Sequence, residues 1–394
     1  MQFSADAFFI FEKLIMKKYF WVGFIGLLLF EILNVYFIMP MPGSQQINSI
    51  DTAYFLYKWR WIFRGLFALM IIVGLLKSSW KRKWIPVIPL VFLCAVIYMA
   101  NFKMAADAMF KMPKELVTVT SNKNKVDSNR LVIGISINGE AKAYPIQFLG
   151  YHHQVQDNVG GKDVLVTYCT VCRTGRVFEP IVKGKKENFR LVGMDHFNAM
   201  LEDATTKSWW QQATGKAIAG KLKGQQLPEV FSTQTTLVKW LLLNPASEIM
   251  QADSAFIKSY SKNMNYEDGT SRDALTGTDS LSWKNKSWVV GVKAGNETKA
   301  YDWNELKTKR LIADNIGKTP ILLVLAEDNK SFFAFERPDY NNAFFLNGDT
   351  LLYTKRLFTI NGKGIDTAYS LTPLPAYQEF WHSWQTFNPR TLKY

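Results

Sequence analysis

The sequence predicts an N-terminal anchor of three transmembrane helices, followed by a mainly-β (α+β) extracytoplasmic domain built from two degenerate repeats. Three observations predict this class. Long apolar runs occupy the first 100 residues, short β-branched and aromatic runs separated by Gly, Asn and Asp begin near residue 114, and residues 131–179 resemble residues 288–336. We expect an anchor over 1–113, a first β-repeat over 114–232, a helical and loop connector over 233–287 and a second β-repeat over 288–394.

The apolar runs are long enough to cross a bilayer, since about 20 residues in a helix cover its hydrocarbon core. Trp and Tyr near their ends are typical of the membrane interface. Two spans follow the first, so a cleaved signal peptide is a poor explanation and the anchor is expected to be retained. The predicted spans are residues 19–40, 61–76 and 84–100.

Basic residues in the short loops set the expected orientation. Lys13, Lys17 and Lys18 precede the first span, and residues 77–83 between the second and third spans hold four Lys or Arg, which places both segments in the cytoplasm. With three spans, everything after residue 100 is then extracytoplasmic. The protein is therefore expected to be a multi-pass membrane protein with a cytoplasmic N-terminus, in contact with the lipid bilayer and with an unidentified small molecule or protein.

Composition excludes other classes. The net charge of +14 is spread among acids and forms no basic stripe, so no nucleic-acid partner is expected. No Gly-rich phosphate loop appears, so no nucleotide is expected. Covalent haem needs His after the second cysteine of a Cys-x-x-Cys pair, where this chain has Arg173.

Two of the three cysteines, Cys169 and Cys172, follow an apolar β-like run at 164–167. A Cys-x-x-Cys turn brings two sulfurs close enough to hold a metal ion or to form a small disulfide. The simpler interpretation is a structural disulfide or two packed thiols.

The repeat serves as an internal control, because residues required by the fold should recur in both copies. Gly134, Tyr144 and Asp157 recur at a constant spacing, which indicates structural roles. The two cysteines and the histidines at 152 and 153 do not recur. Where the first copy has His152, His153, Cys169 and Cys172, the second has Lys309, Arg310, Ala326 and Asn329.

The histidines complete the candidate site. His152 and His153 would point to opposite faces of a strand, so only one can join a shared site. His196 lies in sequence added to the first copy, whereas His382 falls in the C-terminal aromatic segment, which we assign to the core. The candidate catalytic residues are Cys169, Cys172 and His152, and the candidate metal ligands are these three and His196. Expected around them are His153, Asp157, Tyr168, Arg173, Asp195, Asn198, Trp210 and Gln212.

These motifs resemble a bacterial and archaeal family catalogued as domain of unknown function 3179. Its pattern is approximately A-Y-P…W-H-E…V-T-Y-C-P-L-C-G-T, followed by S-x-W-x-Q and a closing F-W…W…F-x-P-x-T. The resemblance maps the family histidine onto His152, with His153 at a position where the family prefers an acid and Thr170 and Arg173 in place of Pro and Gly. It supports the fold and its boundaries but implies no reaction. The matching residues are Ala143-Tyr144-Pro145, Tyr151-His152-His153, Val166 to Thr174, Ser208 to Gln212, Gly215 to Gly220, Phe380-Trp381, Trp384, Phe387, Pro389 and Thr391.

Three functions are weighed for the site. The favoured one is a copper or zinc centre with redox capability, because thiolates and imidazoles suit Cu(I) and Zn(II). The second is thiol–disulfide exchange, with Cys169 or Cys172 as nucleophile and its pKa lowered by Arg173. The third is a non-catalytic binding module with an oxidised pair. Whether the protein is an enzyme stays open at this point.

Overall fold

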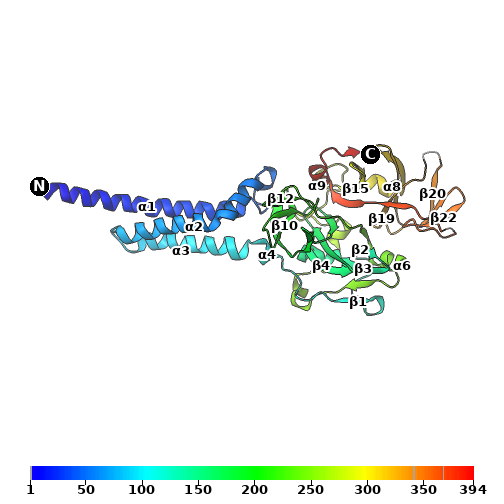
Figure 1. Ribbon diagram of the computed structural model, residues 1–394, viewed down its shortest axis with the longest axis horizontal. Helices are drawn as coiled ribbons and strands as arrows, with labels where there is room; N and C mark the ends of the chain where they lie inside the picture. Colours follow the sequence, from blue (N-terminus) through cyan, green and yellow to red (C-terminus); the bar gives the residue numbers. More distant parts are fainter. Residues whose placement is uncertain (1, 340–341, 367) are drawn as a thin grey trace.

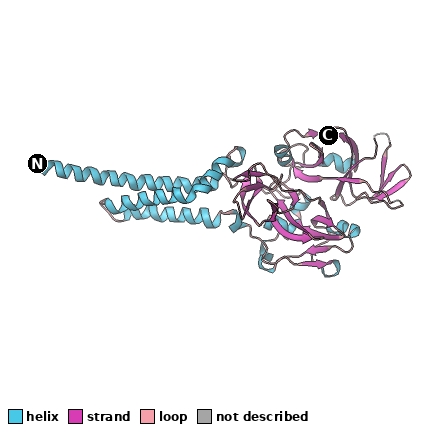
Figure 2. Cartoon of the chain, viewed as in Figure 1, coloured by secondary structure: helices cyan, strands magenta, loops and turns pink. Residues whose placement is uncertain are grey.

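The computed structural model describes residues 2–339, 342–366 and 368–394, with side chains from Leu14 onward. Three long helices project together from one end of a β-rich body, and the chain begins at their far end (Figure 1). Figure 2 shows that almost all the strands lie in that body. The prediction of three apolar helices followed by a mainly-β domain is confirmed. The helices are α1 (Gln2–Tyr36), α2 (Ile50–Lys77) and α3 (Trp84–Tyr98), which a π-helical turn continues over Met99–Lys103.

The first two long helices do not coincide with the residues predicted for the first two spans. Helix α1 ends at Tyr36 rather than at residue 40, just before Pro40 and Pro42. Helix α2 begins at Ile50, well before the predicted start at residue 61. Its additional turns carry Tyr54 and Tyr57, whose rings lie 5.1 and 5.2 Å from the ring of Trp209 in the β-rich body. Packing on that body, which local hydropathy does not report, extends the helix.

One polar cluster joins the three apolar helices. Glu31 of α1 accepts from Arg64 of α2 (Nε to Oε1, 2.6 Å), and Asn101 beyond α3 donates to Glu31 (2.9 Å) and accepts from Arg64 (2.6 Å). Polar groups within an apolar bundle are costly unless they satisfy one another. Because each of the three comes from a different helix, the cluster fixes how the helices are rotated against each other.

The first β-unit begins with two hairpins that flank a short helix. The elements are β1 (Thr118–Thr120), β2 (Leu131–Ile137), β3 (Glu140–Pro145), α5 (Ile146–His152), β4 (Gln154–Val159), β5 (Lys162–Cys169) and β6 (Thr174–Phe178). Strands β4-β5-β6 form an antiparallel sheet. A second sheet has the order β1-β14-β3-β2-β13. Its members β13 (Thr233–Thr236) and β14 (Glu248–Met250) come from the stretch expected to connect the two units.

The second unit has the same order of elements. Tyr144 donates to Asp157 (2.8 Å) in the first unit, and Tyr301 donates to Asp314 (3.0 Å) in the second. A Trp ring also covers a strand glycine in each unit, since a Cβ placed on Gly134 or Gly291 would lie 2.3 Å from Trp240 or Trp384. The elements are β15 (Trp288–Ala294), β16 (Glu297–Asp302), α8 (Trp303–Lys309), β17 (Leu311–Ile316), β18 (Thr319–Leu325) and β19 (Phe332–Glu336).

The remaining elements extend these two units. In the first, β9-β10-β11-β12 form an antiparallel sheet next to the ends of the long helices. In the second, β20-β21-β22 form a hairpin sheet at the far end of the body (Figure 1). Their bounds are α4 (Ala106–Met109), β7 (Ile181–Val182), β8 (Lys185–Lys186), β9 (Phe189–Asp195), β10 (Asn198–Asp203), β11 (Trp209–Gln211), β12 (Ala217–Ala219), α6 (Leu237–Leu243), α7 (Asn265–Asp268), β20 (Phe344–Asn347), β21 (Thr350–Tyr353), β22 (Arg356–Thr359), β23 (Thr372–Leu374), β24 (Ala376–Phe380), α9 (Trp381–Phe387) and β25 (Leu392–Lys393).

Candidate functional site

The two cysteines lie where β5 turns into β6. Cys169 is the last residue of β5 and pairs with Thr174, and Arg173 adopts a left-handed conformation (φ 56°) that closes the turn. Both side chains are buried, and the sulfurs carry free thiols that contact each other through a hydrogen bond. They belong to an apolar cluster with Leu165, Phe178 and Trp210. The turn therefore holds a dry dithiol.

The pKa values of the two thiols are shifted in opposite directions. Burial raises the pKa of the Cys169 thiol, but hydrogen bonds from the Cys172 thiol and from the backbone N–H groups of Cys172, Ala199 and Val171 outweigh it, so the pKa is lowered. Burial and the hydrogen bond to Cys169 raise the pKa of Cys172 well above its usual range. Backbone N–H groups that converge on one sulfur stabilise its thiolate. Cys169 is consequently the first of the pair to ionise.

The C-terminal segment and the loop before β15 cover the same turn. The N–H of Phe380 donates to the carbonyl of Cys172 (3.0 Å), and Nε2 of His382 lies 3.3 Å from the carbonyl of Val171. Lys286 donates from Nζ to that same carbonyl (2.8 Å), close enough for its charge to interact with both sulfurs. Burial lowers the pKa of His382 to about 4 and also lowers that of Lys286.

His382 and Lys286 are the residues that sequence reasoning missed. His382 stood in a segment assigned to the core, and Lys286 closes a polar stretch that carries no motif. Both reach the cysteines through contacts that span more than 100 positions of the chain. No periodicity or spacing reports such contacts. The only available signal was the closing F-W motif, whose Phe380 contacts the turn directly.

His152 and His196 are engaged elsewhere. His152 ends α5 rather than lying on a strand, and its Nδ1 and Nε2 contact the carbonyl of Lys111 (2.5 Å) and the hydroxyl of Tyr260 (2.7 Å). Burial lowers its pKa. Nδ1 of His196 lies 2.6 Å from a carboxylate oxygen of Asp195, whose hydrogen bond raises the pKa of His196.

The expected set of metal ligands is not assembled in the part of the chain that the structure describes. Among residues 2–339, 342–366 and 368–394, no three His, Cys, Asp or Glu side chains are grouped so that they could hold one ion. The reason for His152 is local, because the helix end directs its ring toward Lys111 and Tyr260. Only the two sulfurs remain as neighbouring soft ligands.

The residues expected around the site divide into two groups. Trp210 packs in the cysteine cluster, and Gln212 donates to Thr167 (2.9 Å) and to the carbonyl of Thr174 (3.0 Å), which ties it to the strands of the turn. Asn198 donates to Gln212 (2.8 Å). The hydroxyl of Tyr168 contacts that of Tyr266. The other three side chains have partners of their own: Asp157 pairs with Tyr144 and Lys142 of another sheet, Asp195 binds His196 and Gln211, and Arg173 donates to Gln378 and to the carbonyl of Tyr266.

The turn between β9 and β10 covers Cys169, and the loop between α1 and α2 holds that turn. The Cys169 thiol donates to the carbonyl of Phe197 (3.5 Å), and the N–H of Phe197 donates to Oε1 of Gln45 in the loop between α1 and α2 (3.1 Å). His196 and Phe197 both adopt φ values near 50–66° although neither is glycine. Such strain persists only where surrounding contacts impose it. Gln45 is one of those contacts.

Replacing Gln45 by Ala should therefore loosen the cover over Cys169. Losing the partly buried hydrogen bond to Phe197 should cost about 1–2 kcal/mol locally, so alkylation of Cys169 by a small maleimide should become about tenfold faster. The control is Gln46→Ala, because Gln46 is exposed and no hydrogen bond of its side chain is present in the described part of the chain. Equal alkylation rates in the two variants would show that Gln45 does not hold the turn.

His153 should make the protein less stable in acid. It caps α5 in a left-handed conformation, its ring packs 4.4 Å from that of Phe110, and burial lowers its pKa to about 4. The unfolded chain then binds the proton first, so stability falls as the pH drops from about 6.5 toward 4. Asparagine tolerates the same left-handed backbone. Between pH 7 and pH 5, the free energy of unfolding of His153→Asn should therefore fall by about 2 kcal/mol less than that of the wild type. Urea unfolding of the full chain in detergent measures the free energy of unfolding at each pH. Parallel profiles of stability against pH for the wild type and the variant would contradict the prediction.

The fold and the site define a mainly-β protein of two similarly ordered units on a three-helix apolar segment, with a buried dithiol in the first unit. Residues 112–391 match the model of the family described as "Protein of unknown function (DUF3179)", so the chain belongs to that family. The match confirms the family resemblance drawn from the motifs. Searches of curated proteins and of solved structures returned no match to the chain.

Proposed function

We propose that Cys169 and Cys172 form a reversible dithiol–disulfide centre in an extracytoplasmic domain that three helices tether to the membrane. The observation that carries the proposal is the contact between the two thiols together with the opposite shifts of their pKa values. Unequal thiols in a Cys-x-x-Cys turn are the arrangement that thiol exchange uses. The absence of the pair from the second unit supports a role in chemistry rather than in the fold.

The exchange divides the work between the two sulfurs. The Cys169 thiolate attacks a sulfur of a partner disulfide, a mixed disulfide forms, and one partner thiolate leaves. Cys172 then gives up its proton and attacks the sulfur of Cys169, which releases the second partner thiolate and leaves the Cys169–Cys172 disulfide. The pair supplies two electrons and two protons, and the partner disulfide accepts them. Lys286 stabilises the anionic sulfur, since its ammonium group interacts with both.

The location proposed for this chemistry follows from the basic residues that flank the spans. Lys residues before the first span and in the 77–83 loop favour the cytoplasm, which leaves the β-rich domain outside, where disulfides persist. Both sulfurs are buried, so a partner gains access only when the turn at His196 and Phe197 moves. The strain in that turn lowers the cost of moving it.

Copper binding is the second candidate, and one observation favours it. Two thiols in contact within an apolar cluster, with no His, Asp, Glu or third Cys grouped near them in the described residues, suit Cu(I), which soft thiolates select. Two thiols are too few for zinc, because zinc takes four protein ligands in structural sites and three in catalytic ones.

Redox titration of the full chain in detergent tests the proposal. The protein is equilibrated with mixtures of reduced and oxidised dithiothreitol, and the remaining thiols are trapped by alkylation and counted by mass spectrometry. We expect a two-electron transition between Cys169 and Cys172, which Cys169→Ser and Cys172→Ser abolish and Cys94→Ser leaves unchanged. A pair that stays reduced throughout while binding one Cu(I) per chain would replace the redox proposal with the copper one. A pair that does neither would overturn both.

A further inference from the structure

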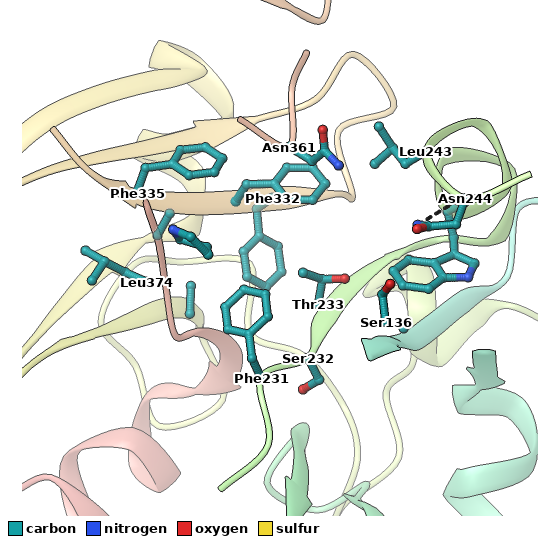
Figure 3. A pocket seen from close by; sticks show the side chains of 16 residues that line it. Ser136, Phe231, Ser232, Thr233, Leu243, Asn244, Phe332, Phe335, Asn361 and Leu374 are labelled. Carbon is teal, nitrogen blue, oxygen red and sulfur yellow. Dashed lines mark hydrogen bonds between the residues drawn. The ribbon is translucent and has the colours of Figure 1, made fainter. Parts of the chain in front are cut away.

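A cavity of about 260 Å³ lies between the two units, away from the cysteines (Figure 3). The first unit contributes β13, the loop before it and α6, and the second unit contributes β19 and β23. Four Phe side chains and one Trp line it, together with a few polar groups. The cavity plays no part in the dithiol chemistry proposed above.

The cavity exists because two sheet edges face each other without pairing. Strand β13 is the edge of its sheet, and β19 pairs on one side with β23 only from Ala334 onward. At one end the edges are joined, since the N–H of Thr236 donates to Oγ of Ser331 (2.9 Å). Around Thr233, at the other end of β13, the cavity takes the place of such contacts.

The lining has one buried hydroxyl that no described residue satisfies. The hydroxyl of Thr233 is buried and has no hydrogen-bond partner in the described part of the chain. Figure 3 shows it beside the ring of Phe231, with Phe332 across the cavity. Asn361 accepts from Thr359 through its Oδ1 (2.5 Å), and its NH₂ group donates to no described residue. A buried hydroxyl without a partner is costly unless a bound molecule completes it.

We infer that this cavity binds a planar aromatic molecule that carries one hydroxyl or carbonyl group. Its rings would pack between Phe231, Phe332 and Trp240, and its polar group would hydrogen-bond to Thr233. Apolar walls with a few convergent polar groups are typical of small-molecule sites. Filled to the density of a protein interior, the cavity takes about ten to fifteen non-hydrogen atoms, which corresponds to two fused rings. Phe231 is 45% exposed and stands where such a molecule would enter.

Two probes of the same shape separate the apolar and polar parts of the inference. We would titrate the full chain in lipid nanodiscs with 2-naphthol and with naphthalene, using empty nanodiscs as the blank. We expect saturable 1:1 binding of 2-naphthol. Thr233→Val should weaken 2-naphthol about tenfold and leave naphthalene unchanged, because it removes only the hydrogen bond. It should also stabilise the unliganded protein, because the unpartnered hydroxyl is gone.

Two further cavity variants and one control variant complete the test. Phe231→Ala should weaken both probes about fivefold or more, whereas Phe345→Ala, which removes an exposed Phe from β20, should change neither. Ala376→Phe should block the cavity and abolish binding. Saturable binding that is the same in all the variants would overturn the inference. So would the absence of binding up to the solubility limit of 2-naphthol. Near-UV circular dichroism shows whether each variant is folded. If one variant is misfolded, the remaining variants still test the inference.

Discussion

Replacing Arg176 by Leu is expected to lower the free energy of unfolding of the full chain by about 3–5 kcal/mol. Arg176 of β6 and Glu379 of β24 form an ion pair across the two units, and each side chain is only 1% exposed. The guanidinium also stacks 3.5 Å from the ring centroid of Tyr377 and reaches Glu229 (Nε to Oε1, 3.5 Å). Without Arg176, the Glu379 carboxylate stays buried and unpaired, so the substitution costs far more than the pair itself contributes.

A surface pair of similar geometry provides the control. Lys162 and Glu179 lie 2.6 Å apart but their side chains are 44% and 27% exposed, so Lys162→Met should change the free energy of unfolding by less than about 1 kcal/mol. The double variant Arg176→Leu, Glu379→Leu should recover much of the loss, because it removes both buried charges. Urea unfolding followed by Trp fluorescence measures all three. If Arg176→Leu were as stable as Lys162→Met, the ion pair would not hold the units together.

Much of the fold could be read from local patterns. Hydropathy identified the three apolar helices, and short β-branched and aromatic runs separated by Gly, Asn and Asp indicated the strands, because both signals come from neighbouring residues. The similarity between residues 131–179 and 288–336 also indicated which side chains have structural roles. Tyr144 and Asp157 recur in the second copy as Tyr301 and Asp314, and the same hydrogen bond is present in both units.

The candidate site was less accessible to sequence reasoning. The Cys pair stood out by its spacing, but its neighbours depend on how distant segments pack. His152 was expected on a strand, whereas it ends a seven-residue helix whose direction sends the ring away from the sulfurs. His382 and Lys286 reach the turn only because the second unit folds against the first. Local patterns do not determine contacts at that separation.

Three segments that are far apart in the sequence meet around one turn. Gln45 holds the cover over Cys169, Tyr266 donates to the carbonyl of Thr170 (3.1 Å), and Phe380 donates to that of Cys172. Each comes from a different part of the chain. A β-rich domain cut away from the three long helices would lose the contact of Gln45 and keep the other two, so we expect the reactivity of Cys169 to depend on the presence of those helices.

Arg173→Met should be the other strongly destabilising change, with a loss of about 3 kcal/mol or more. The guanidinium is fully buried and donates to Gln378 (2.8 Å) and to the carbonyls of Tyr266 (2.8 Å) and Glu267 (3.1 Å). It also stacks 3.7 Å from the ring centroid of Trp288. Methionine fills similar space but leaves those acceptors without this donor. Arg173→Lys should not rescue, since one ammonium group cannot reproduce the planar, stacked geometry.

The second unit supplies the matched control. Lys330 occupies the position equivalent to Arg173, but its pair with Asp268 (2.6 Å) is partly exposed, so Lys330→Met should cost less than about 1 kcal/mol. Arg173→Met should in addition speed alkylation of Cys169, because Tyr266, which holds the cysteine turn through Thr170, loses its bond to Arg173. A loss of stability with unchanged alkylation would mean that Arg173 joins the two units without positioning the thiols. Equal stability of the two variants would contradict both roles.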